Sequence, residues 1–147
     1  MKDKELLLIS HFRSNARKNL TKISKETGIP ISTIFSKLKQ YEGDVIRKFT
    51  SLLDFQKLGY DVRVSILLKV DKEDRENVGN FLARHSSINS VFRINNAYDY
   101  LIEGIFRNMQ EVHQFMEQID KFKILEKEQF YILDDIKREA FMEKTAI

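Results

Sequence analysis

Apolar residues in the first third of the chain recur every three or four positions, which is the spacing of helices that bury one side. The pattern predicts three short helices, which span Lys4 to about Ser14, Leu20–Thr27 and about Pro30 to Glu42. Asn19 suits the N-cap of the second helix, and Gly28 suits its end, because glycine tolerates the left-handed conformation that often stops a helix. The buried stripe of the third helix is predicted to contain Ile34, Leu38 and Tyr41.

The pattern changes after Gly43. The β-prone segment Val45–Leu53 is predicted to form a wing or a linking strand, and Asp54–Tyr60 resembles a joint between two parts of the chain. From Val62 to Val70, every second residue is apolar, and Arg63, Ser65, Leu67 and Lys69 lie between them, which predicts a strand with one buried face.

Five further elements are predicted after this strand, in the order helix, strand, strand, helix, strand. They begin at about Glu73 and continue at Ile88–Ile94, Tyr98–Phe106, Met109–Ile119 and Gln129–Leu133, with a turn at Asn95-Asn96. The resulting β-α-β-β-α-β order is typical of a ferredoxin-like fold, an antiparallel sheet with two helices on one face. Lys137–Ile147 is expected to be a short helix or a tail.

These elements predict an α+β protein with two domains. We expect a winged helix-turn-helix in residues 1–53, a joint in residues 54–60 and a ferredoxin-like domain in residues 61–147.

Charge divides the chain at nearly the same place. The net charge is +3, but residues 1–60 hold 12 Lys/Arg against 6 Asp/Glu, whereas residues 61–147 hold 13 against 16. A basic first part indicates contact with a polyanion, although random drift in surface charge would give the same imbalance. The absence of cysteine excludes disulfides, zinc ribbons and thiol catalysis. Since there is no secretory signal and no apolar run near the ~20 residues that span a bilayer, we expect a cytoplasmic protein.

The side of the third helix opposite its buried stripe is polar, and such a helix can enter the major groove of DNA and bond base edges. The candidate contacts on this helix are Ser32, Thr33, Ser36, Lys37, Lys39 and Gln40. Further candidates for phosphate contacts are Arg13, Arg17, Lys18, Lys22, Arg47 and Lys48. The alternative is a solvated helix face in a small bundle. The glycine turn, the buried stripe and the basic charge together favour DNA.

Several short motifs, in their order and spacing, resemble the leucine-responsive regulator/asparagine regulator (Lrp/AsnC) family of prokaryotic transcription factors, of the archaeal type. The resemblance covers nearly all of Lys4 to Arg138, and its motifs are Asn15-Ala16-Arg17, Ile23–Gly28, Ser32–Glu42, Asp54–Tyr60 and Tyr98-Asp99-Tyr100. It implies a winged helix-turn-helix joined to a ferredoxin-like sensor domain that dimerises through its sheet, often within an octamer. It also implies double-stranded DNA as a partner and, in many members, an amino acid bound between sensor domains.

The chain departs from the family pattern at several positions. Pro30 lies near the N-cap of the third helix, where the family commonly has Ser. Phe35 and Ser36 lie at positions of this helix where basic residues are frequent in the family. After Glu42 the chain is one residue shorter than usual. The Asn95-Asn96 turn of the sensor domain, called the sensor turn below, contains Asn96 where the family usually has Gly. Asn can adopt the same left-handed conformation.

An amino-acid effector needs a carboxylate for its ammonium group and N–H donors for its own carboxylate. The positions that match the family here are Asn95, Asn96, Ala97, Tyr98 and Asp99. Asp99 could equally stabilise a turn or a subunit contact.

Catalysis is the main rival class, because some decarboxylases of haem synthesis resemble this family. His85 is expected on the apolar side of a helix as a core or edge residue, and His11 and His113 lack a partner at metal-ligand spacing. With no nucleophile motif and no phosphate-binding Gly-rich loop, we expect neither an enzyme nor a metal or cofactor site. Two alternatives stay open on the same fold: an architectural DNA-binding protein of low specificity and, less favoured, a tetrapyrrole-modifying enzyme.

Overall fold

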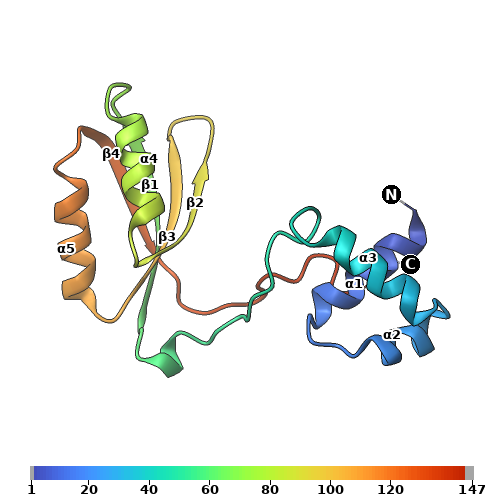
Figure 1. The fold of residues 1–147 in the computed structure, drawn as a ribbon. Coiled ribbons are helices and arrows are strands. Elements are labelled where there is room, and N and C mark those ends of the chain that lie inside the picture. The colour runs from blue at the N-terminus through green and yellow to red at the C-terminus, as the bar shows by residue number, and fades with distance from the viewer. Residues whose placement is uncertain (1, 145–147) are drawn as a thin grey trace. The chain divides into compact units, whose positions relative to one another are not determined.

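The computed structural model describes residues 2–144 and divides into two compact units (Figure 1). The first unit comprises Met1–Leu52 together with Ile136–Ile147, and the second comprises Leu53–Asp135. Among the described residues, no helix is long and apolar enough to cross a membrane.

The first unit is built on three helices, α1 (Asp3–Ser14), α2 (Leu20–Thr27) and α3 (Ile31–Tyr41), as the apolar spacing predicts. At the start of α2, the Asn19 side chain accepts a hydrogen bond from the Thr21 N–H at 2.7 Å. The helix ends at Gly28, whose φ of 73° is left-handed. Pro30 is the N-cap of α3 and lies just before the helix, not in its first turn.

One apolar cluster holds the three helices together. Ile23 from α2 and Ile34 from α3 are fully buried, and Leu8, Phe12 and Ile29 pack with them. Fully burying an aliphatic or aromatic side chain contributes roughly 1.5–3 kcal/mol. The cluster therefore fixes which side of α3 faces inward, and it leaves the opposite side to the solvent.

The predicted strand at Val45–Leu53 is wrong. The segment after α3 forms one isolated bridge, between Glu42 and Ile46, and residues 47–54 take no regular structure. β-propensity reflects how side chains fit a sheet, whereas a strand also needs a neighbour to pair its backbone groups. Over residues 2–52 and 136–144 the structure contains no such neighbouring strand.

Residues 136–144 group with the first unit, although the sequence predicted them as part of the domain of residues 61–147. Residues 137–144 form bends and turns without a helix, and residues 145–147 lie outside the described part. Arg13 holds this tail beside α1, because its Nη2 donates to Glu139 Oε2 and its Nε donates to Phe141 O, both at 3.0 Å.

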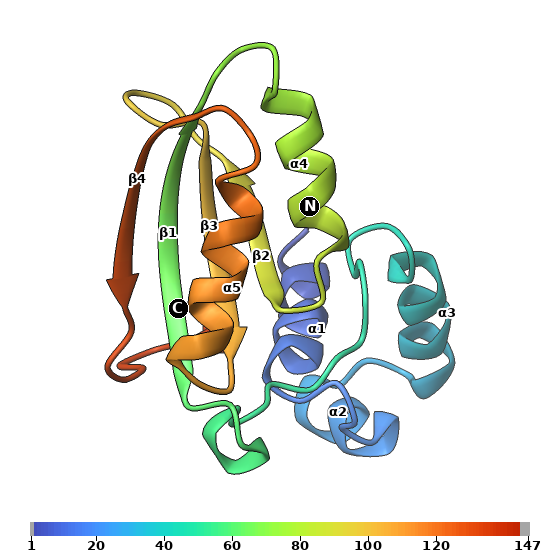
Figure 2. The same ribbon diagram turned by 90° about the vertical axis from the view of Figure 1, so that its left-hand side faces the viewer.

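The second unit is a four-stranded antiparallel sheet with two helices on one face (Figure 2). Its elements are β1 (Val62–Val70), α4 (Arg75–Arg84), β2 (Ile88–Arg93), β3 (Tyr100–Phe106), α5 (Met109–Ile119) and β4 (Ile124–Tyr131), preceded by the short 3-10 helix η1 (Gln56–Leu58). The strands lie side by side in the order β2-β3-β1-β4. The element order is the predicted β-α-β-β-α-β.

A last strand is present as predicted, but it occupies Ile124–Tyr131, so the predicted limits Gln129–Leu133 are wrong. β4 is an edge strand, and all its side chains after Ile124 are exposed. No hydrophobic alternation therefore marks the strand in the sequence. Its position follows from pairing with β1, in which Ser65 lies opposite Phe130.

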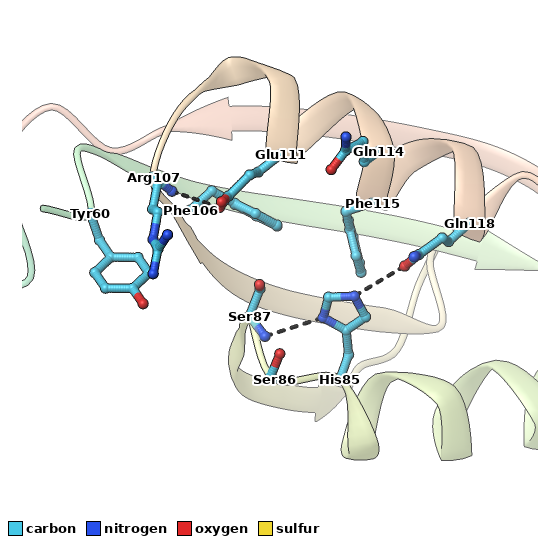
Figure 3. Close-up of a pocket in the computed structure, with 10 residues that line it drawn as sticks. All are labelled: Tyr60, His85, Ser86, Ser87, Phe106, Arg107, Glu111, Gln114, Phe115 and Gln118. Atoms are coloured by element: carbon cyan, nitrogen blue, oxygen red, sulfur yellow. Dashed lines mark hydrogen bonds between the residues drawn. The ribbon is translucent and has the colours of Figure 1, made fainter.

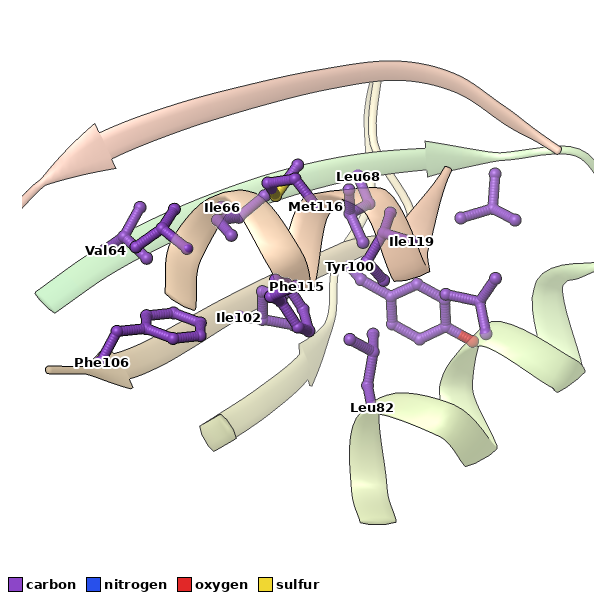
Figure 4. Close-up of a cluster of buried hydrophobic side chains, with 13 residues drawn as sticks. Val64, Ile66, Leu68, Leu82, Tyr100, Ile102, Phe106, Phe115, Met116 and Ile119 are labelled. Atoms are coloured by element: carbon purple, nitrogen blue, oxygen red, sulfur yellow. The ribbon is translucent and has the colours of Figure 1, made fainter. Parts of the chain in front are cut away.

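The core of the second unit fills the space between the sheet and its helices (Figure 4). Val64, Ile66 and Leu68 of β1 are fully buried, as the alternation predicts. Phe115 of α5 and Leu82 of α4 close over them from the helix layer. The other face of the sheet is not covered by α4 or α5 and carries the intervening residues of each strand.

Candidate nucleic-acid interface and effector site

The outward side of α3 carries most of the polar residues selected from the sequence. Five of the six are exposed, namely Ser32, Thr33, Ser36, Lys39 and Gln40. Ile34, on the opposite side of the helix, is fully buried. Hydroxyl and amide groups both donate and accept hydrogen bonds, so this surface can address the donors and acceptors on base edges.

Lys37, the sixth residue, is half-buried and is engaged within its own unit. Its Nζ donates to Glu5 Oε1 of α1 at 3.1 Å. This hydrogen bond is the main cause that lowers the pKa of Glu5. Lys37 therefore neutralises a carboxylate of the protein, and its charge is only partly available to a ligand.

Lys39 and Phe35 form a pair on the exposed side of α3. The Lys39 Nζ lies 5.0 Å from the centroid of the Phe35 ring, which is a cation–π contact. Half of the Phe35 surface is exposed. The ring thus lies on the same accessible surface as the polar residues and outside the core.

The cations around α2 fall into two kinds. Lys18 is held by Glu26, with 2.6 Å between Nζ and Oε2, and its Nζ also lies 2.9 Å from His11 Nδ1. Only 17% of the Lys18 side chain is exposed. Arg17 and Lys22 are exposed.

Arg47 and Lys48 lie beyond α3, in the segment without regular structure, and both are exposed. This segment was expected to be a strand. No strand therefore orients these two side chains.

The sensor turn between β2 and β3 has the backbone that the sequence predicts. Asn96 has a φ of 70°, and Asn95, Asn96 and Ala97 are exposed, whereas Tyr98 and Asp99 are half-buried. Both Asp99 carboxylate oxygens are in use: Oδ2 accepts from the Val70 N–H at 2.8 Å, and Oδ1 lies 3.2 Å from Arg75 Nε. Asp99 therefore ties the turn to the end of β1 and to α4.

A cavity of about 370 Å³, which was not predicted from the sequence, lies on the helix side of the second unit (Figure 3). Its lining residues are Tyr60, His85, Ser86, Ser87, Phe106, Arg107, Glu111, Gln114, Phe115 and Gln118. The Arg107 guanidinium lies 5.4 Å from the centroid of the Tyr60 ring. No sequence motif joins these positions, since the fold brings them together from four separate segments.

His85 has a structural role at the edge of this cavity. It follows α4 directly, its Nε2 lies 3.0 Å from Gln118 Oε1, and its Nδ1 accepts from the Ser87 N–H at 3.2 Å. The ring also packs edge-on against Phe115 at 5.0 Å. Within residues 2–144, no group of three or more His, Asp and Glu side chains is arranged to hold a metal ion.

The proteins that this chain resembles in sequence are transcriptional regulators of the helix-turn-helix (HTH) type. The chain is 31% identical over 118 residues to the HTH-type transcriptional regulator FL11 of Pyrococcus horikoshii. The aligned residues cover 80% of this chain and 77% of FL11. It is 24% identical over 140 residues to an HTH-type regulator of Pyrococcus furiosus, covering 95% of both chains. Residues 63–140 match the sequence profile of the Lrp/AsnC ligand binding domain. The chain belongs to the Lrp/AsnC family of transcriptional regulators, in an archaeal-type form.

Solved structures share the fold. The transcriptional regulator NMB0573 of Neisseria meningitidis, in complex with L-Met, superposes with a TM-score of 0.85 at 18% identity and covers 94% of this chain and 93% of its own. LrpC of Bacillus subtilis gives a TM-score of 0.84 at 17% identity, covering 93% of this chain and 97% of its own.

Proposed function

We propose that the protein is a sequence-specific regulator that reads double-stranded DNA with α3, as the second helix of a helix-turn-helix formed with α2. The observation that carries this proposal is the two-sided character of α3, whose inner side is sealed by the core while its outer side presents exposed hydroxyl, amide and ammonium groups. A helix of this kind places short polar side chains within reach of base edges in the major groove.

Phosphate contacts are assigned to the exposed cations of the first unit. Arg17 and Lys22 lie near the start of α2, Lys39 lies on α3, and Arg47 and Lys48 follow it. Lys18 and Lys37 belong to the candidate interface as well. Each would first have to exchange its carboxylate partner for a phosphate, so their contribution to affinity is smaller.

A symmetric dimer built on the ferredoxin-like second unit would present two reading helices to one face of the DNA. The outer face of the sheet supports this arrangement, because Leu67, Leu101 and Phe92 form a row across β1, β3 and β2 through their strand register. Phe92 is 57% exposed in the single chain. Burying such a row between two copies removes apolar surface from water. We also propose that such dimers can assemble further, up to an octamer.

An amino acid bound near Asn95–Asp99 is proposed as the effector. The family's ligand binding domain covers this turn, and the structurally similar Neisseria regulator was solved with L-Met. The exposed backbone of Asn95, Asn96 and Ala97 can supply N–H donors for a carboxylate. Asp99 then positions the turn through Val70 and Arg75, and it shares its negative charge with the ligand's ammonium group.

The DNA-reading role is tested by removing single charges and measuring DNA affinity over a range of salt concentrations. Lys39→Gln and Arg47→Gln should each weaken binding and reduce the slope of log affinity against log salt by about 0.9 per lost phosphate contact. Lys121→Gln, which removes an exposed charge from the second unit, is the matched control and should leave the slope unchanged. Equal slopes for the wild type, Lys39→Gln and Arg47→Gln would contradict the docking of α3 on DNA.

A further inference from the structure

The exposed side of α3 consists of two parallel rows of different chemistry. Residues four apart on a helix lie one above the other on the same side. One row is polar and contains Ser32, Ser36 and Gln40. The other begins with Ile31, continues with Phe35 and ends with Lys39, so two apolar side chains stand beside the polar row.

The apolar row does not serve the core of the unit. Ile31 is 45% exposed and Phe35 is 50% exposed, whereas Ile34 on the buried side of the helix is completely inaccessible. Phe35 instead lies under the ammonium group of Lys39, 5.0 Å from the ring centroid. This contact holds the ring against the helix surface and leaves the rest of it open to a partner.

The major groove offers an apolar surface at only one kind of base. Thymine carries a C5-methyl group beside its O4 acceptor, and apolar side chains such as Phe contact that methyl group. Serine and glutamine side chains, which form the neighbouring row, can bond the adenine and thymine edges next to it. The two rows together therefore match A·T base pairs better than G·C pairs.

We propose that Phe35 is a specificity-determining residue that packs against a thymine C5-methyl group in each half-site, with Ile31 beside it at the start of α3. The inference rests on the proposed function, because it requires α3 to lie in the major groove. From Ile31 to Lys39 the helix rises about 12 Å, which corresponds to roughly three or four base-pair steps. The thymine should therefore lie within a short A·T-containing block of the half-site.

Uracil provides a direct test, since it differs from thymine in DNA only by the missing methyl group. In a half-site selected from random DNA with the wild-type protein, each thymine is replaced in turn by deoxyuridine, and the dissociation constant is measured at fixed salt. At one position, the replacement should weaken the binding of the wild-type protein about fourfold per half-site, which is the loss expected for one buried methyl group. Phe35→Ala should bind the thymine and uracil versions equally at that position. Phe35→Leu, which keeps an apolar contact, should retain part of the difference.

Phe49→Ala is the matched control, because Phe49 is 47% exposed in the same unit but lies outside α3. It should keep the full thymine preference. Wild-type binding that is insensitive to every uracil replacement, an equal loss in wild type and Phe35→Ala, or a selected half-site without A·T pairs would each overturn the inference while leaving DNA binding intact. Failure of the wild-type protein to bind any DNA would instead overturn the proposed function.

Discussion

At the scale of single residues, the structure separates charges that can meet a ligand from charges that serve the fold. Lys18 and Lys37 were chosen from the sequence with the other basic residues, yet each is paired with a carboxylate of its own unit. Asp99 was chosen as a ligand for an ammonium group, and both of its oxygens contact the protein. The local sequence does not predict the Lys37–Glu5 and Arg75–Asp99 pairs, because each pair joins positions far apart in the chain.

His11 should make the stability of the first unit depend on pH. Burial, followed by the neighbouring Lys18 charge, lowers the pKa of His11 from 6.5, and the nearby Glu26 opposes this only partly. The unfolded chain therefore binds more protons than the folded chain once the pH falls through 6.5. The contribution of His11 to the stability of the first unit is complete above that pH and is lost as the pH falls below it. Lowered pKa values of Glu5 and Glu26 add a further loss only below about 4.5. Hydrogen exchange of α1 and α2 amides at pH 7.5 and 5.5 measures this loss, and His11→Gln should reduce it; an unchanged loss would show that another group titrates.

Asp99 and Arg107 distinguish the two places in the second unit where a small molecule could bind. Asp99→Ala should abolish an amino-acid-induced rise in melting temperature, measured from the variant's own baseline, because the variant releases the turn from Val70 and Arg75. Arg107→Gln removes the cation of the helix-side cavity and should leave the rise intact. If Arg107→Gln abolished the rise and Asp99→Ala left it intact, the effector site would be the cavity and not the turn.

At the scale of elements, helices with local signals were predictable and elements that depend on a distant partner were not. The limits of α2 follow from Asn19 and Gly28, which act within one turn of the helix. The alternation in β1 is equally local, because both its burial and its period are written in nine consecutive residues. β4 and the segment after α3 lack such information, since one is a strand only through β1 and the other has β-prone residues without a pairing partner.

Gly79 in α4 tests how tightly that helix packs on the sheet. A Cβ added there would lie 2.7 Å from Tyr100 Oη, which donates to Arg75 O at 2.7 Å. Alanine gains up to about 1 kcal/mol in helix propensity, but displacing a buried ring and its hydrogen bond costs roughly 1–3 kcal/mol. Urea unfolding should show Gly79→Ala to be destabilised by about 1 kcal/mol. In a Tyr100→Phe background the same change should be neutral or stabilising; destabilisation of equal size there would rule out the Tyr100 contact as its cause.

At the scale of the whole molecule, we propose that the first unit reads DNA and that the second unit pairs with a second copy of itself. The two units are connected at Leu52–Leu53 and again at Asp135–Ile136. Two-fold pairing through the outer face of the sheet would give two equivalent α3 helices, and DNA with two equivalent half-sites is their natural complement.

Selection of bound sequences from random DNA, with and without a pool of amino acids, tests this central claim most directly. We predict an enriched palindrome whose half-sites are centred about 34 Å apart or a multiple of that distance, and whose yield changes when amino acids are present. Broad, weak binding without an enriched sequence would contradict it and would favour a DNA-coating protein of low specificity.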